Sequence, residues 1–210
     1  MEVAKYEAVE TLRDGRQTRV RALKSDDRAG LLSAVSKSSA QSLYRRFFSP
    51  KRSLTEDEVA YFMDVDFIDH VALVAELEED GRGVIIGGGR YVLVEPGKAE
   101  VAFAVVDRYQ EQGVGTALMR HLLAIARHVG LEELTAEVLA DNISMLKVFE
   151  KSGLRVSTTR DAGVILCRSS AFLKRKRQAH LGGPCWRNIK TAAWRAANRE
   201  RWRLFEQGQP

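Results

Sequence analysis

The sequence predicts an α/β domain built from a mixed sheet with helices on both faces. Three observations indicate this class. Short apolar runs rich in β-branched residues alternate with helical patterns along residues 9–168. One of these runs leads through a polar, glycine-containing loop into a long amphipathic helix. The sequence contains no internal repeat and no low-complexity segment, so a single sheet can accommodate all of these elements.

The stretch 99–130 is the clearest of these combinations. Residues 100–106 are apolar and β-branched, as in a buried strand, and residues 107–112 are polar and can turn. From Val114 onward apolar residues recur at the spacing of one helical face, and Gly130 supplies a stop. The apolar positions on this face are Val114, Ala117, Leu118, Leu122, Ile125 and Val129.

Capping and turn residues delimit the remaining elements. Asp14-Gly15 predicts a two-residue hairpin. Residues 87–89 are three glycines, and because no helix follows them we expect a bulge or a crowded strand contact rather than an anion-binding loop. The expected helix N-caps are Ser25, Ser38 or Ser39, and Thr55. The expected strands are 9–12, 16–23, 71–77, 84–94, 134–139, 155–159 and 164–168, and the expected helices are 26–37, 40–48, 56–65 and 142–152.

The composition is that of one globular domain of 210 residues, with 45% hydrophobic and 29% charged residues. Cys167 and Cys185 form neither a disulfide framework nor a metal-binding pattern. His121 and His128 share a helix face, but two imidazoles without a third ligand do not predict a metal site. The charged N-terminus is unlike a signal peptide, and no apolar run approaches the length of a membrane span. We therefore expect a cytoplasmic protein without a metal.

The positive charge is concentrated at the C-terminal end. Residues 171–210 hold ten Lys or Arg and two Glu, which gives +8, whereas the whole chain carries +5 and the remainder therefore −3. The stretch 174–185 has the composition of a linker, and 186–205 is typical of a basic helix with tryptophans. Such a helix could bind an anionic membrane, nucleic acid, an acidic protein surface or its own domain, and the sequence leaves these partners open.

Gly113 and Gly115 predict an anion site at the start of the long helix. The first four N–H groups of a helix have no intrahelical acceptor, and the helix dipole is positive there. Two glycines allow a phosphate oxygen to approach the backbone without meeting a Cβ. The chain contains no P-loop string, and Leu118 stands where a dinucleotide fingerprint needs a small residue.

The string Gln110-x-x-Gly113-x-Gly115 resembles the acyl-CoA pyrophosphate loop of the GNAT superfamily of N-acetyltransferases. The preceding strand, 99–105, is similar to the catalytic strand of that superfamily's protein-lysine acetyltransferases, and 141–154 resembles its second signature. The resemblance covers about residues 17–170 and is greatest to the acetyltransferase domain of bacterial Pat-type enzymes. It implies the GNAT fold, a mixed, mostly antiparallel sheet of six or seven strands flanked by helices. Further similar runs are SLYRRFF (42–48), HVALVA (70–75) and EVLADNISML (137–146).

The resemblance implies roles for individual residues. Glu100 stands at the position of the general base. Asn142 matches an asparagine that contacts the pantetheine or phosphate arm, although an ordinary N-cap explains it equally well. Many members carry a tyrosine seven residues later as general acid, and here Phe149 leaves that role unassigned. The expected acetyl-CoA-binding residues are Val105, Val106, Gln110, Gln112, Gly113, Val114, Gly115, Thr116 and Asn142.

The acceptor groove is expected near Tyr44, Arg45 and Arg46, because the first two helices of GNAT domains cover that edge. The same residues could form only the basic face of a helix. His70, before a buried strand, could line the groove or have no role.

The expected boundaries are a lead-in hairpin strand (1–16), the acetyltransferase domain (17–170) and the basic tail (171–210). In Pat-type proteins the domain is often joined to a cyclic-nucleotide-binding or acyl-CoA-synthetase-like domain. We expect neither of these in this chain, and therefore no cyclic-nucleotide control.

Three functions remain compatible with these patterns. The first is acetyl-CoA-dependent acetylation of protein lysines, with acyl-CoA synthetases as the targets that the resemblance implies. The second is acetylation of a small amine, which predicts a closed acidic pocket. The third is a non-catalytic acyl-CoA-binding module whose tail engages nucleic acid or membrane.

The first two functions need a base, because a lysine ammonium with a pKa of about 10.4 is protonated at neutral pH. We expect apolar Val101 and Ala102 to raise the pKa of Glu100 so that its carboxylate can remove this proton. A backbone N–H near Val105 is expected to stabilise the oxyanion.

Overall fold

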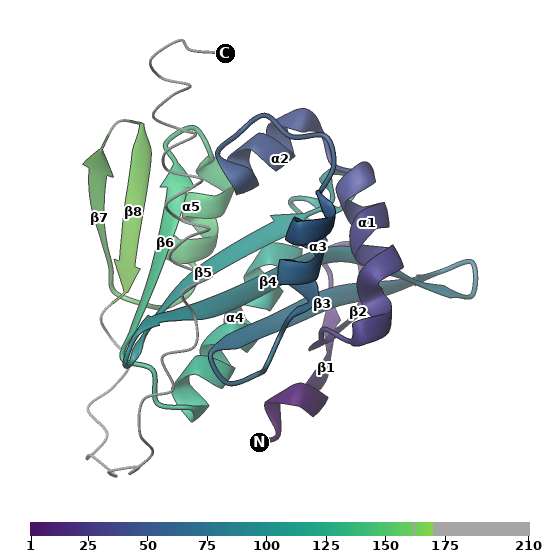
Figure 1. Ribbon diagram of the computed structural model, residues 1–210, viewed down its shortest axis with the longest axis horizontal. Helices are drawn as coiled ribbons and strands as arrows, with labels where there is room; N and C mark the ends of the chain where they lie inside the picture. Colours follow the sequence, from purple (N-terminus) through teal and green to yellow (C-terminus); the bar gives the residue numbers. More distant parts are fainter. Residues whose placement is uncertain (162, 170–210) are drawn as a thin grey trace.

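The computed structural model describes residues 1–161 and 163–169, so the expected basic tail lies outside the described residues. The described strands are β1 (Glu7–Thr11), β2 (Gln17–Ala22), β3 (His70–Glu79), β4 (Arg82–Glu95), β5 (Lys98–Val105), β6 (Glu133–Leu139), β7 (Val156–Asp161) and β8 (Val164–Ser169). They form one sheet in the order β1-β2-β3-β4-β5-β6-β8-β7 (Figure 1).

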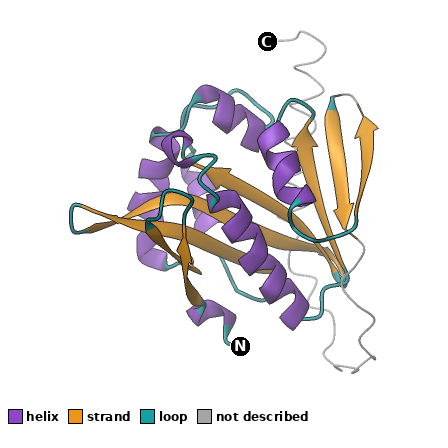
Figure 2. Ribbon diagram, turned by 180° about the vertical axis from the view of Figure 1, so that it is seen from behind, coloured by secondary structure: helices purple, strands orange, loops and turns teal. Residues whose placement is uncertain are grey.

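Helices cover both faces of this sheet, as the sequence predicts. The helices are α1 (Arg28–Ser36), α2 (Ala40–Phe47), α3 (Glu56–Met63), α4 (Val114–His128) and α5 (Ile143–Glu150). The first three lie on one face, whereas α4 and α5 lie on the opposite face (Figures 1 and 2). The helix stop at Gly130, with a φ of +81°, and the N-caps at Ser39 and Thr55 are confirmed.

The sheet is split between β5 and β6. These two strands run parallel and pair only where Lys98–Glu100 meet Glu133–Thr135, whereas the other neighbouring strands are antiparallel. Beyond these pairs the strands diverge (Figure 1). The facing edges of β5 and β6 are therefore not paired with each other beyond Glu100 and Thr135.

The triple glycine lies in β4, at the centre of the sheet. Pairing shifts there between Ala75–Gly87 and Glu76–Ile85, which makes a β-bulge. A Cβ on Gly89 would lie 2.6 Å from Cδ1 of Phe103, so β4 and β5 are crowded at this point. Both features expected of the triple glycine are therefore present.

The number of strands and the start of the first long helix differ from expectation. The sheet has eight described strands instead of six or seven, because β1 pairs with β2 along its whole length. The first long helix begins at Arg28 and not at residue 26. The Asp27 carboxylate accepts a hydrogen bond from the Lys24 N–H (2.7 Å) and pairs with Arg21 (2.7 Å), which holds Ser25–Asp27 as a 3-10 turn, η2.

His121 lies on the side of α4 that faces the N-terminal segment. Its Nδ1 lies 2.5 Å from the Tyr6 hydroxyl and its Nε2 lies 2.7 Å from the Glu10 carboxylate, so it ties the N-terminal segment to the helix. No group of three potential metal ligands occurs within residues 1–161 and 163–169. Within the same residues, no helix has the length and apolar character needed to cross a bilayer.

Candidate active site

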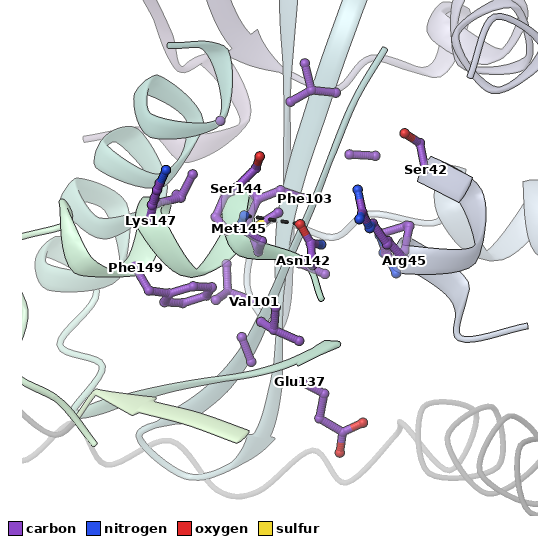
Figure 3. A pocket seen from close by; sticks show the side chains of 18 of the residues that line it. Ser42, Arg45, Val101, Phe103, Glu137, Asn142, Ser144, Met145, Lys147 and Phe149 are labelled. Atoms are coloured by element: carbon purple, nitrogen blue, oxygen red, sulfur yellow. Dashed lines mark hydrogen bonds between the residues drawn. The ribbon is translucent and has the colours of Figure 1, made fainter. Parts of the chain in front are cut away.

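A cavity of about 830 Å³ occupies the split between β5 and β6. Residues of both strands, of α2 and α5, and of the first turn of α4 line it. Figure 3 shows Ser42 and Arg45 of α2 on one side of this space and Asn142 and Ser144 of α5 on the other.

The loop before α4 has the geometry of an anion site. Gly113 caps the helix with a φ of +97°, a conformation that favours glycine. The first intrahelical bond runs from the Ala117 N–H to the Gly113 carbonyl (2.9 Å). The N–H groups of Val114, Gly115 and Thr116 therefore have no partner within the helix, and all three residues line the cavity.

Polar side chains fasten α2 to this loop. The Gln110 amide donates to the Val105 carbonyl (3.1 Å) and to the Ser42 hydroxyl (3.0 Å). The Asp107 carboxylate accepts from the Ser39 N–H (2.8 Å) and from the hydroxyls of Ser39 (2.7 Å) and Ser42 (2.8 Å). Burial favours a higher pKa for Asp107, but these hydrogen bonds outweigh it and lower the pKa overall. The carboxylate thus stays ionised and holds the helix terminus in place.

The hairpin between β1 and β2 brings a cation to the same loop. The Arg13 N–H donates to the Gln112 carbonyl (3.0 Å), and its guanidinium donates to the Glu111 carbonyl (2.8 Å). Arg13 lines the cavity, whereas the Gln112 side chain donates to the Arg108 carbonyl (3.0 Å).

Helix α5 forms the opposite wall. The Asn142 side chain caps it by accepting from the Met145 N–H (3.2 Å; Figure 3), so the capping role is present and Asn142 also lines the cavity. Lys147 and Lys151, one turn apart, line the same wall. The Phe149 ring also borders the cavity and is only 3% exposed.

Glu100 lies where the two strands part. It is the last residue of β5 that pairs with β6, it is half-buried, and it lines the cavity. Its apolar neighbour Val101 is buried as expected. A cation also lies nearby: burial lowers the pKa of Arg46, and the charge of Glu100 opposes this shift.

The structure brings most of the expected site residues together. Val106 is an exception, because it is buried in the core and its N–H donates to the Ile86 carbonyl (3.0 Å). Gln112 does not line the cavity, since its side chain bonds to Arg16 and to the Arg108 carbonyl. Tyr44 borders a separate pocket together with Lys51. His70 is buried outside the cavity lining. The expected residues that line the cavity are Glu100, Val105, Gln110, Gly113, Val114, Gly115, Thr116, Asn142, Arg45 and Arg46.

Several cavity residues were missed by the sequence analysis. Lys147 and Lys151 had a signal, because their spacing places them on one face of the helix that Asn142 caps. Arg90 had a weaker sequence signal, because it is the charged residue in the expected strand 84–94, which is otherwise without charge. Asp107, which holds α2 against the loop without lining the cavity, had no sequence signal, because its contacts with Ser39 and Ser42 join distant parts of the chain.

The family model of the GNAT acetyltransferases matches residues 38–154, which is more than half of the chain. The split sheet, the glycine loop and this match define an acyltransferase. The chain belongs to the GNAT acetyltransferase family.

Three known proteins illustrate the similarity. Acetyltransferase Pat of Mycolicibacterium smegmatis is 38% identical over 133 residues, covering 61% of this chain, and the chain spans only 38% of that relative's length. Acetyltransferase PA5475 of Pseudomonas aeruginosa is 32% identical over 138 residues, which is 65% of this chain and 74% of the relative. The crystal structure of the GNAT domain of S. lividans PAT superposes with a TM-score of 0.71 at 36% identity, covering 79% of this chain and 97% of that domain.

Proposed function

We propose that this chain acetylates the ε-amine of lysine residues in proteins, with acyl-CoA synthetases as targets and Glu100 as the general base. One observation carries the proposal: Glu100 and the first turn of α4 line the same cavity, so a thioester held at the turn can reach the carboxylate. Similarity to the Pat proteins supports a protein acceptor.

Acetyl-CoA fits the chemistry of the lining. The free N–H groups of Val114, Gly115 and Thr116 would hold the pyrophosphate, with Gln110 and Gln112 shaping the loop. The cations of Arg13, Lys147 and Lys151 would attract the remaining phosphate charge. The pantetheine would lie along β5 as an added strand, using backbone groups of Val105 and the Asn142 amide.

The residues of the split then perform direct transfer. The Glu100 carboxylate accepts a proton from the lysine ammonium, either directly or through water, and the neutral amine forms a bond to the acetyl carbon. The C–S bond breaks, the thiolate of CoA departs, and the nitrogen of the new amide releases its second proton to water. A backbone N–H near Val105 stabilises the negative charge on the carbonyl oxygen.

Departure of the thiolate needs no donor from residue 149. A thiol has a pKa of about 8.5, so its anion is a stable leaving group near neutral pH. Phe149 supplies an apolar wall in place of the hydroxyl found in many relatives. We propose that protonation of the thiolate follows its release to solvent.

The charge at the acceptor end distinguishes protein lysine from a small cationic amine. A small-amine enzyme is expected to surround its acceptor with acidic residues. Here Arg46 and Arg90 lie in the lining near Glu100, and the other lining carboxylates, Glu111, Glu137 and Asp161, belong to other elements. A bare polyamine would meet these two cations. The lining therefore favours an acceptor whose charge is balanced by other groups.

The test is acetyl transfer from labelled acetyl-CoA to a panel of acyl-CoA synthetases and, separately, to a panel of small amines. We expect label on a synthetase lysine, located by mass spectrometry. Glu100→Gln should reduce the rate by about 10²–10⁴-fold. Glu150→Gln, which removes an exposed carboxylate outside the cavity, is the matched control. Label on small amines alone would overturn the proposed acceptor.

A further inference from the structure

Two arginines meet beside Glu100, and the proposed reaction does not use them. Arg90 of β4 and Arg46 of α2 both line the cavity. Their guanidinium carbons lie 4.2 and 5.8 Å from the centroid of the same Phe62 ring, so the two cations are close neighbours. We call them the arginine pair.

The Arg90 guanidinium is held in a fixed position. It lies 2.9 Å from Nε2 of His70 and donates to the Phe62 carbonyl (3.4 Å). The opposite nitrogen of His70, Nδ1, lies 2.9 Å from the Asp64 carbonyl, which is consistent with a neutral imidazole that donates there and accepts from Arg90. His70 is thus a positioning residue for Arg90.

The surroundings leave the pair short of negative charge. Burial, and then the charge of Arg46, lower the pKa of Arg90 to about 9. Glu100 is the carboxylate whose charge acts on Arg46, and no carboxylate contributes to Arg90. Among the described residues neither arginine forms an ion pair. Beside the arginine pair the two guanidinium groups outnumber the single Glu100 carboxylate, and the other carboxylates of the lining, Glu111, Glu137 and Asp161, lie on other elements.

We infer that the arginine pair binds a carboxylate of the acceptor, placed close to the amine that is acetylated. This inference rests on the proposed function and specifies its substrate class. An arginine fork matches a carboxylate with two parallel hydrogen bonds, and the added negative charge offsets the repulsion between the pair and the incoming ammonium. The carboxylate can come from an Asp or Glu beside a protein lysine, or from the α-carboxylate of a free amino acid.

The test compares kcat/KM for two lysine peptides that differ only by Glu or Gln next to the lysine. We expect the wild-type protein to prefer the acidic peptide by about 10–100-fold. Arg90→Gln and Arg46→Gln should each bring this ratio close to one. Arg90→Lys should keep part of it, because the charge remains while the fork is lost.

Arg82→Gln is the matched control, since Arg82 is exposed at the far end of β4 and does not line the cavity. This variant should keep the wild-type ratio. Calorimetric titration with CoA shows that each variant is folded. Equal kcat/KM for both peptides in the wild-type protein, or a ratio that survives loss of either arginine, would overturn the inference.

A second arm separates the two proposals and the two sources of carboxylate. Free amino acids with a side-chain amine are compared with their α-amides. If no peptide is acetylated but the free acids are preferred over the amides, protein acetylation fails and the arginine pair keeps its role. If peptides are acetylated without a preference for the acidic one, protein acetylation stands and the carboxylate-binding role of the arginine pair is wrong.

Discussion

At Gly115 the fold and the ligand make different demands. A Cβ there would lie 3.4 Å from Cγ2 of Val148 and 3.9 Å from Cγ2 of Val105, which are ordinary contacts. Alanine also favours helix over glycine by up to about 1 kcal/mol. Gly115→Ala should therefore leave the melting temperature unchanged or slightly higher, yet weaken CoA binding about tenfold because the methyl group occupies phosphate space. Calorimetry measures the affinity, and unchanged affinity would contradict a phosphate site at this turn.

His70 predicts a pH dependence of stability. Burial, and then the charge of Arg90, lower the pKa of its imidazole to about 4, from 6.5 in the unfolded chain. Between these values the unfolded chain binds more protons, so stability falls as the pH drops through this window. Through His70 alone, the free energy of unfolding should fall by about 2 kcal/mol from pH 7 to pH 5.

Denaturant unfolding of His70→Gln at both pH values checks this. Between pH 7 and pH 5, the free energy of unfolding of the variant should fall by about 2 kcal/mol less than that of the wild type. His128→Gln, which changes an exposed histidine, should behave as the wild type. Parallel curves for the wild type and His70→Gln would show that the buried imidazole does not titrate in this window.

At the scale of elements, two adjacent glycines of β4 provide a matched pair. A Cβ on Gly89 would lie 2.6 Å from the buried Phe103 ring, whereas one on Gly88 would lie 3.4 Å from the Leu73 carbonyl. Gly89→Ala should lower the free energy of unfolding by about 1–3 kcal/mol through overpacking, and Gly88→Ala should change it by less than about 1 kcal/mol. Denaturant titration compares them, and equal costs would mean that Phe103 of β5 is not packed against Gly89 of β4.

Elements with local signals could be predicted from the sequence. The strand, loop and helix around Gly113 carry their own periodicity and stop signals, and Thr55 with Glu58 forms the expected capping box. The start of α1 could not be predicted, because it depends on a buried pair between Asp27 and Arg21 of β2. The position of Tyr44 could not be predicted either. Tyr44 and Arg45 are neighbours on α2, but only Arg45 lines the cavity.

At the scale of the whole molecule, the site depends on contacts between distant segments. The binding of Asp107 to the N-terminus of α2, and of His70 to Arg90, follows from the order of strands in the sheet. A single sequence carries no such pairing information. Local motifs therefore predicted the glycine loop, the candidate base Glu100 and the groove residues Arg45 and Arg46, whereas the contacts of Arg90 with His70 emerged only from the fold.

The split also predicts how CoA changes the dynamics of the molecule. Only three residue pairs join β5 to β6, so β6, β7 and β8 have few backbone bonds to the rest of the sheet. A ligand bound across the split should slow hydrogen exchange in β6, β8 and α5 and leave β1 to β3 nearly unchanged. Exchange measured by mass spectrometry checks this, and uniform protection across the sheet would argue against binding in the split.

The most direct test of the central claim is the pH dependence of single-turnover acetyl transfer to a lysine peptide by the wild-type protein and by Glu100→Gln. The account predicts that both bind acetyl-CoA equally, and that the variant is about 10²–10⁴-fold slower at pH 7. Its rate should rise towards that of the wild type as the pH approaches the lysine pKa of about 10.4, where the free amine needs no base. Superimposable rate profiles for the two proteins would contradict the assignment of Glu100 as the base.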